Sequence, residues 1–322
     1  MIFVHEDPEF RLLLELISST RGVDPGVVEK DYWVTHTLWA IQAQGWELWF
    51  KGGTSLSKGF SLIERFSEDL DLRLQPGPGR TLPEVSSWTK DSPSHVASRR
   101  AHLEALGRAL VIPGAVVQDA PEHWDDRCRN AAYRVEYPRQ VETRLGGVLR
   151  EHVLLEVGDA RVTPFVPCDL SSFVHDQLRE AGQAGEFIDN RALSVRCVHP
   201  LVTALEKLDA ISRRFSRDPV EAATFIRHYE DVARVLEALP RLPPLPGSLA
   251  DLVVEMCALR QLRAPPTADD PAFLGGGGAA WDAVERAYLD IAPMFWGPRV
   301  PLSRCCALIR AWLTRPEPPP AP

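Results

Sequence analysis

The sequence predicts an α+β fold, in which an N-terminal domain with a small mixed sheet is followed by a C-terminal helical bundle. Three observations support this prediction: strand and helix patterns alternate in the first half, helical periodicity dominates the second half, and the chain has 322 residues. A chain of this length is expected to form about two domains. We expect the mixed domain, with N-terminal helices, over residues 1–195, the helical domain over 196–315, and a disordered proline-rich tail over 316–322.

Helix and strand signals alternate in the first half. Asp24 followed by Pro25 is typical of a helix N-terminus, apolar residues then recur at helical spacing to Ile41, and Gly45 ends the pattern. The other elements expected here are strands at 46–51, 70–74, 131–137 and 148–157, and helices from Thr54 and over 95–110.

In the second half, apolar residues recur at helical spacing through 201–215. Asp218, Pro219 and Glu221 form a capping box, which predicts a second helix that runs to Leu239. Two or three further helices are expected before the tail.

Composition excludes several classes of protein. The longest apolar runs are interrupted by charges and fall short of the roughly 20 residues that span a bilayer, so no membrane segment is expected. The N-terminus lacks the layout of a secretory signal, and the six cysteines show no metal-ligand spacing, so we expect reduced thiols in a cytoplasmic protein. The net charge of −8 argues against a protein that coats nucleic acid with its whole surface.

Arginines nevertheless concentrate between positions 127 and 150. The six arginines of this segment outnumber its two glutamates and give a local excess of positive charge. Two interpretations stay open: a patch that contacts a polyanion, or solvated arginines along strand edges. The arginines are Arg127, Arg129, Arg134, Arg139, Arg144 and Arg150.

Two aspartates one residue apart indicate a metal site. Asp69 and Asp71 alternate with leucines in a predicted strand, so both carboxylates point to the same side. Carboxylates this close repel each other unless a cation lies between them. Oxygen-only ligands suit Mg²⁺, with Mn²⁺ as the alternative metal.

The turn before this strand suits a phosphate. Gly52 and Gly53 have no side chains, so backbone N–H groups can approach a phosphate closely, and Thr54 and Ser55 add hydroxyl donors. Alone, this turn is typical of a helix N-cap, and the aspartate pair is typical of an exposed strand face. The glycine turn comes first and the aspartate pair follows after one short helix. This combination favours metal-assisted nucleotidyl transfer from a nucleoside triphosphate (NTP).

A third carboxylate is expected from a neighbouring strand. Glu156 interrupts the hydrophobic run at 153–157, and burying a glutamate is costly without a partner. Glu156 would then act as a metal ligand, or as the base that deprotonates the attacking hydroxyl. The alternative is a strand-end glutamate that faces solvent.

Four segments resemble the AbiEii/AbiGii toxin family, which belongs to the DNA polymerase β-like nucleotidyltransferase superfamily and is related to the MenT toxins. These segments are VEKDYWVTHTLWAI, KGGTSLSKGF with IERFSEDLDL, HPLVTALEKLDAISRR and FIRHYEDVARVLE, which together cover residue 28 to about residue 239. The resemblance implies a polymerase β-like domain and a Mg²⁺-dependent type IV toxin. It would transfer a nucleoside monophosphate from an NTP to an RNA 3′-hydroxyl, with the tRNA acceptor end as the expected target, and so block translation. It also implies a cognate antitoxin that need not bind the toxin directly.

The resemblance assigns roles to individual residues. Lys207 would bind the triphosphate, with Arg214 on the same helix stripe, and Asp231 would be the essential acid of the last motif. The residues expected to bind the nucleotide are Gly52, Gly53, Thr54, Ser55, Lys58, Ser67, Lys207 and Arg214. The expected catalytic residues are Asp69, Asp71, Glu156, Lys207 and Asp231, of which Asp69, Asp71 and Glu156 would be the metal ligands. Lys30 and Asp31 also match the family.

Plainer alternatives stay open for these assignments. Lys207 and Arg214 would also suit a solvated helix face, and Asp231 could form an i, i+4 pair with Arg227. For the whole protein, the alternatives are transfer of AMP or UMP to a protein hydroxyl, and a catalytically idle module that binds nucleotides or RNA.

Overall fold

The computed structural model describes residues 1–65, 69–145 and 149–315. The chain forms two compact units. The sheet unit comprises Met1–Gly59 and Ser67–Cys197, and the helical unit comprises Phe60–Phe66 and Val198–Pro322. The short segment Phe60–Phe66 therefore belongs to the helical unit, although the chain on both sides of it belongs to the sheet unit. The expected domain boundary at residue 195 stays a prediction, and the expected disordered tail lies outside the described residues.

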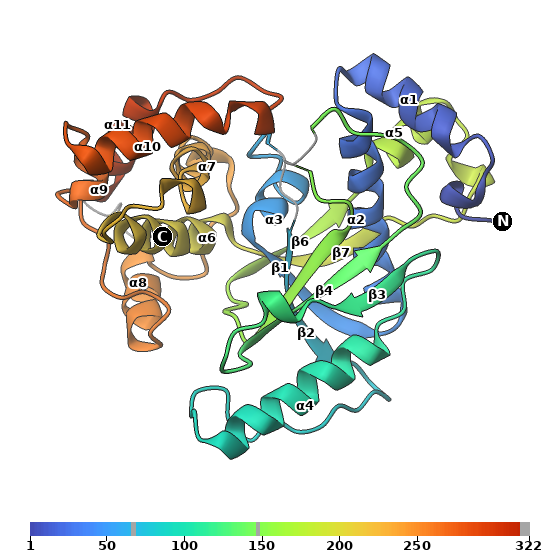
Figure 1. Ribbon diagram of the computed structural model, residues 1–322, viewed down its shortest axis with the longest axis horizontal. Coiled ribbons are helices and arrows are strands. Elements are labelled where there is room, and N and C mark those ends of the chain that lie inside the picture. The colour runs from blue at the N-terminus through green and yellow to red at the C-terminus, as the bar shows by residue number, and fades with distance from the viewer. Residues whose placement is uncertain (66–68, 146–148, 316–322) are drawn as a thin grey trace. The chain divides into compact units, whose positions relative to one another are not determined.

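The described part of the sheet unit contains a seven-stranded sheet with the order β3-β4-β5-β2-β1-β7-β6 (Figure 1). The strands are β1 (Trp46–Lys51), β2 (Asp69–Pro76), β3 (Val116–Asp119), β4 (Asn130–Glu136), β5 (Val153–Gly158), β6 (Phe165–Leu170) and β7 (Ala192–Val198). Strand β2 pairs antiparallel with β1 and parallel with β5, and β4 pairs antiparallel with β5. The sheet is thus mixed, but it has more strands than the sequence predicts.

Alternation along β2 places its acidic residues on one face. Leu70, Leu72 and Leu74 are buried, whereas Asp69 and Asp71 are half-buried on the opposite face. This pattern confirms the predicted alternation, because successive side chains of a strand point to opposite sides of the sheet. The leucines anchor the strand in the core, so the two carboxylates are held on a rigid element.

Five helices belong to the described part of the sheet unit. They are α1 (Phe10–Arg21), α2 (Pro25–Ala43), α3 (Gly52–Lys58), α4 (Pro93–Ala109) and α5 (Phe173–Glu180). Asp24 caps α2 as predicted, since its carboxylate accepts a hydrogen bond of 2.9 Å from the Gly26 N–H. Helix α2 is buried on most sides and packs against α1, α5 and β1. Tyr133 of β4 donates a hydrogen bond of 2.7 Å to the Leu103 carbonyl and so joins α4 to the sheet.

The helical unit contains α6 (Pro200–Phe215), α7 (Arg227–Glu237), α8 (Leu249–Ala258), α9 (Pro271–Leu274), α10 (Ala279–Asp290) and α11 (Leu302–Leu313). Helix α7 packs against α6 and α11. Val202, Leu205 and Met256 are fully buried and belong to a core shared by α6 and α8. In the described residues four helices follow α7, where the sequence predicts two or three.

The predicted helix from Asp218 to Leu239 is wrong at its start. The α-helix begins at Arg227, after a short 3-10 turn at 222–224. Phe225 and Ile226, between this turn and the helix, are both fully buried. Burial of these side chains outweighs the local capping signal.

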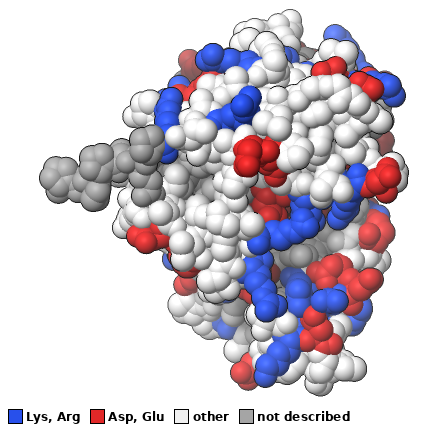
Figure 2. Space-filling view, turned by 90° about the vertical axis from the view of Figure 1, so that its left-hand side faces the viewer, with Lys and Arg blue, Asp and Glu red and all other residues white. Residues whose placement is uncertain are grey.

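The surface and the thiols fit the composition. None of the helices in the described ranges is both long and apolar enough to cross a membrane. All six cysteines are free thiols. On the face shown in Figure 2, Lys and Arg side chains lie beside Asp and Glu side chains, so charges of both signs are mixed there.

Candidate functional site

Three carboxylates lie on one face of two adjacent strands. Asp71 of β2 and Glu156 of β5 are partners in the parallel register, and Asp69 lies two residues before Asp71. Burial, together with the negative charges of Asp71 and Asp69, raises the pKa of Glu156 to about 8. The ionised form of Glu156 is therefore disfavoured as long as no cation lies among the three carboxylates, and its side chain shares a hydrogen bond with Asp71. A cluster of this kind is stabilised by a cation.

An arginine supplies one positive charge to this cluster. Arg150 donates a hydrogen bond of 2.6 Å from Nη1 to Asp69 Oδ1, and both side chains remain partly exposed. Among the described residues, no three His, Cys, Asp or Glu side chains are placed to hold a metal ion. The donor set itself suits Mg²⁺, because it consists of carboxylate oxygens. A divalent cation thus suits the carboxylates of Asp69, Asp71 and Glu156 in chemistry. Arg150 would have to release Asp69 for the cation to bind.

The glycine turn lies directly against the second aspartate. Gly52 has a φ of +77°, and a Cβ atom added to it would lie 1.8 Å from Asp71 Oδ2. Only glycine satisfies both the backbone conformation and this close approach. Helix α3 begins at Gly52, two residues earlier than predicted, so the turn and the helix N-terminus coincide. The predicted neighbourhood of the glycine turn and the D-x-D strand is therefore present in the structure.

The two hydroxyl residues of the turn point into the protein. Thr54 is buried, and its hydroxyl donates a hydrogen bond of 2.7 Å to the backbone carbonyl of Asp69. Ser55 is also buried, with its hydroxyl next to the Cys197 thiol. Thr54 therefore fixes the start of β2, and backbone groups of the turn are the better candidates for phosphate contact. Direct nucleotide contact by either hydroxyl stays a prediction.

The basic residues near the turn are held by helix α2. Lys58 forms an ion pair with Asp31, and Asp31 also accepts a hydrogen bond of 2.8 Å from the Phe173 N–H. Lys30 is fully buried and donates a hydrogen bond of 3.0 Å to the Arg150 carbonyl. Lys30 thus fixes the backbone of Arg150, and Asp31 fixes the side chain of Lys58. Ser67, predicted to bind the nucleotide, lies outside the described residues.

A second group of predicted residues lies in the helical unit. Asp231 of α7 is completely buried, and Lys207 of α6 approaches its Oδ2 to 2.9 Å. Arg65 occupies the same carboxylate with two hydrogen bonds of 2.7 Å. Although burial opposes ionisation, the Arg65 and Lys207 cations hold the pKa of Asp231 well below its ordinary value. Asp231 therefore stays ionised as the counter-ion of Arg65 and Lys207. A carboxylate that stays ionised is unsuited to a proton-transfer role.

The end of α6 is electropositive. Arg214 donates a hydrogen bond of 2.5 Å to the Thr224 carbonyl. Burial, and then the neighbouring Arg213, Arg227 and Arg217 cations, lower the pKa of Arg214. The alternative pair between Arg227 and Asp231 is not formed, since the Asp231 carboxylate pairs with Arg65 and Lys207. Lys207 and Arg214 thus lie on a helix whose C-terminal half carries several positive charges.

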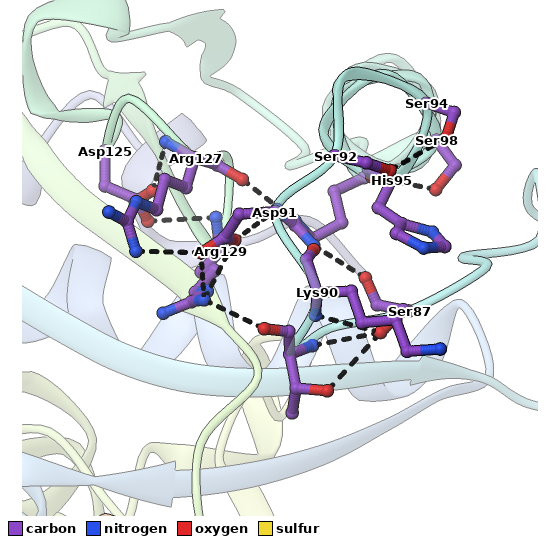
Figure 3. Close-up of polar contacts among 12 residues, drawn as sticks. Ser87, Lys90, Asp91, Ser92, Ser94, His95, Ser98, Asp125, Arg127 and Arg129 are labelled. Carbon is purple, nitrogen blue, oxygen red and sulfur yellow. Dashed lines mark hydrogen bonds and ion pairs between the residues drawn. The ribbon is translucent and has the colours of Figure 1, made fainter.

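The arginine-rich segment at 127–150 is largely neutralised. Arg127 and Arg129 each approach Asp91 to 2.8 Å (Figure 3). Arg99 shares the same carboxylate. Five of the six arginines have a carboxylate partner within the described residues. These ion pairs favour the structural interpretation of the segment over a free polyanion-binding patch.

The structure therefore gathers the predicted residues into two groups. The group in the sheet unit comprises Gly52, Gly53, Thr54, Ser55, Lys58, Asp69, Asp71 and Glu156. The group in the helical unit comprises Lys207, Arg214 and Asp231. Sequence reasoning missed Arg65, although it lies within one of the quoted segments, because its partner Asp231 is 166 residues away. It also missed the pairing of Arg150 with Asp69, which nothing in the local spacing indicates.

Comparison with known families places most of the chain within one family model. The model described as "Nucleotidyl transferase AbiEii toxin, Type IV TA system" matches residues 38–295, which is most of the chain and includes both groups of residues. A search of curated proteins finds no match.

Proposed function

Because this chain belongs to the AbiEii family of type IV toxin nucleotidyl transferases, we propose that it transfers a nucleoside monophosphate from an NTP to an RNA 3′-hydroxyl. The proposed target is the tRNA acceptor end, and the proposed effect is a block of translation in the cytoplasm. The observation that carries this proposal is the cluster of Asp69, Asp71 and Glu156 against the Gly52 turn. Nucleotidyl transfer requires neutralised phosphates and a fixed position for the attacking oxygen, and a rigid acid cluster beside a glycine turn supports both.

In the proposed reaction, the RNA 3′-oxygen attacks the α-phosphorus of the NTP, the bond to the bridging oxygen breaks, and pyrophosphate leaves. Asp69, Asp71 and Glu156 would hold Mg²⁺, which when bound neutralises phosphate charge and favours ionisation of the attacking hydroxyl. Burial and the two aspartates raise the pKa of Glu156, and a cation bound among the three carboxylates would lower it again, so we assign Glu156 the role of metal ligand.

The remaining residues position the reacting groups. Gly52 leaves room for the Asp71 carboxylate, and the Thr54 hydroxyl fixes the Asp69 backbone. Lys207 would bind the triphosphate as a point charge through the 11% of its side chain that is exposed. The cognate antitoxin is proposed to act without binding this chain directly.

The proposal is tested by incubating the full chain with each labelled NTP, Mg²⁺, total tRNA and cell-extract protein. We expect label on the RNA 3′ end, lost in Asp69→Asn and Asp71→Asn. Asp159→Asn is the matched control, because it removes a carboxylate of the same unit that pairs with Arg73 at 3.3 Å. Label found only on protein would replace the RNA acceptor by a protein hydroxyl, and no labelling by the folded protein would leave a module that only binds nucleotides or RNA.

A further inference from the structure

Two cysteine thiols meet on neighbouring strands of the sheet. Strand β6, which carries Cys168, lies at the edge of the sheet beside β7, which carries Cys197. The two thiols share a hydrogen bond, and close by the Asp169 carboxylate accepts another, of 2.8 Å, from the Ser194 N–H. Cys168 and Cys197 are therefore held in contact by the pairing of the two strands.

The two cysteines differ in their access to solvent. Cys197 is fully buried, and its partner in the pairing of β7 with β1 is the buried Phe50. Cys168 is only half-buried, on a strand whose first residue, Phe165, is 40% exposed. A small oxidant from solvent can therefore reach the Cys168 side chain, whereas it reaches Cys197 only through Cys168.

The shared hydrogen bond makes the exposed thiol the more acidic of the two. The Cys197 S–H donates to the Cys168 sulfur, which holds the pKa of Cys168 below its usual value, although burial and the Asp169 charge oppose this effect. The same hydrogen bond, and then burial, raise the pKa of Cys197. Burial also raises the pKa of Cys305 to about 12 and that of Cys306 to about 11. Because the thiolate is the reactive form of cysteine, Cys168 is the nucleophile of its pair.

Helix α3 packs directly against the inner thiol of the pair. A Cβ atom added to Gly59, the C-cap of α3, would lie 3.0 Å from Cys197 Sγ, so the helix has no free space at this point. Ser55 of the same helix is buried, with its hydroxyl beside this sulfur. Because α3 begins with the turn at Gly52, the side chain of Cys197 supports the helix whose first residue contacts Asp71.

We propose that Cys168 and Cys197 are a site of reversible oxidation, at which a peroxide converts the two thiols to a disulfide and so disturbs the support of α3. The Cys168 thiolate attacks hydrogen peroxide, the O–O bond breaks, Cys168 becomes a sulfenic acid, and hydroxide leaves and takes up a proton. The Cys197 sulfur then attacks the Cys168 sulfur, the S–O bond breaks, and the hydroxyl group leaves as water with the Cys197 proton. The two thiols thus lose two electrons, and one molecule of hydrogen peroxide becomes two molecules of water.

The disulfide changes the contacts of α3 because a covalent bond draws two sulfur atoms closer together than a hydrogen bond does. The Cys197 sulfur moves toward β6, and its contacts with Gly59 and Ser55 change. A thiol reductant reverses the step by exchange with the disulfide. The consequence for nucleotidyl transfer rests on the proposed function, since it requires that the turn at Gly52 positions the nucleotide.

The test treats the full chain with hydrogen peroxide, before and after addition of dithiothreitol. Peptide mapping should find a disulfide between Cys168 and Cys197, and hydrogen exchange of the α3 amides should become about tenfold faster, as expected when local support weakens. Pyrophosphate release with total tRNA should become about tenfold slower, because a displacement of about 1 Å near the reacting groups costs about a hundredfold and α3 moves by less. Dithiothreitol should reverse all three changes.

Two serine variants serve as matched controls. Cys168→Ser removes the exposed thiol, so peroxide should form no disulfide and leave the exchange of α3 and the transfer rate unchanged. Cys257→Ser removes another half-buried thiol, which lies in the helical unit, and should respond to peroxide as the wild type does. Should Cys168→Ser not fold, Cys168→Ala provides the same comparison, and the peptide map of the wild type identifies the oxidised pair without any variant.

The outcomes separate this inference from the proposed function. Absence of the Cys168–Cys197 disulfide after peroxide treatment would overturn the inference, and so would a disulfide that leaves the exchange of α3 at its reduced value. Slower transfer that persists in Cys168→Ser would also overturn it, since the oxidation responsible would then lie elsewhere. Reduced wild-type protein that transfers no nucleotide would overturn the proposed function alone, because the peptide map and the exchange of α3 still decide this inference.

Discussion

Replacing Gly52 by alanine tests the acid cluster most directly. The new Cβ would lie 1.8 Å from Asp71 Oδ2, so the carboxylate would have to retreat by about 1.6 Å to reach the ordinary contact distance of 3.4 Å. The φ of +77° adds about 1–2 kcal/mol of backbone strain. A displacement of about 1 Å in a catalytic group costs about a hundredfold in rate, or about 2.7 kcal/mol in the barrier. We expect Gly52→Ala to fold and to lose about a hundredfold in nucleotidyl transfer.

The assay is pyrophosphate release with total tRNA as the acceptor, combined with thermal unfolding of each variant. Gly182→Ala is the matched control, because Gly182 has a similar φ of +74° in the same unit but no atom within 4 Å of an added Cβ. This control should lose similar stability and keep its activity. Activity of Gly52→Ala within about twofold of the control would refute the assignment of Asp71 to the reaction.

Three further predictions concern the turn, the metal and the core. Thr54→Val removes the hydroxyl that holds the Asp69 backbone, so we expect about tenfold slower transfer, measured as pyrophosphate release, whereas Thr54→Ser should stay near wild type. Chelation by EDTA should abolish transfer, and added Mg²⁺ should restore it; activity that persists in EDTA would contradict the metal-ligand role of the acids. His36 is fully buried, donates to the Pro113 carbonyl and contacts Asn190. Burial lowers its pKa from 6.5 to about 4, so the unfolded chain binds more protons below pH 6.5, and the unfolding free energy should fall by about 3 kcal/mol by pH 4. Urea unfolding of wild type and His36→Gln across this range checks the sign, because the variant should lack this part of the pH dependence.

Local patterns were sufficient for the elements that carry the acids. The alternation of leucine and aspartate in β2 predicted that Asp69 and Asp71 share one face, and the single glutamate in the apolar run of β5 indicated Glu156 as a third carboxylate. Such patterns work because one side of the strand is in the core, which forces the other side chains outward. Asp24 likewise marked the start of α2 through its own short-range hydrogen bond.

Other features depend on contacts between distant residues. Arg65 and Asp231 each have ordinary local sequence surroundings, and only the tertiary fold joins them. The strands β3 and β6 lie at the two edges of the sheet and are largely exposed, so they carry no clear apolar signal. The start of α7 was mispredicted for the same reason, since burial of Phe225 and Ile226 decides it.

Because Phe60–Phe66 belongs to the helical unit, this protein can finish folding only late in its synthesis. Asp231 and Phe295, which hold Arg65, are made long after it during synthesis. A nascent chain that already contains every strand of the sheet still lacks the partners of this segment, and so does any fragment cut before α7. Neither unit can be expressed alone with the contacts of Arg65 intact. In the cell, these contacts can therefore form only in chains that are nearly complete.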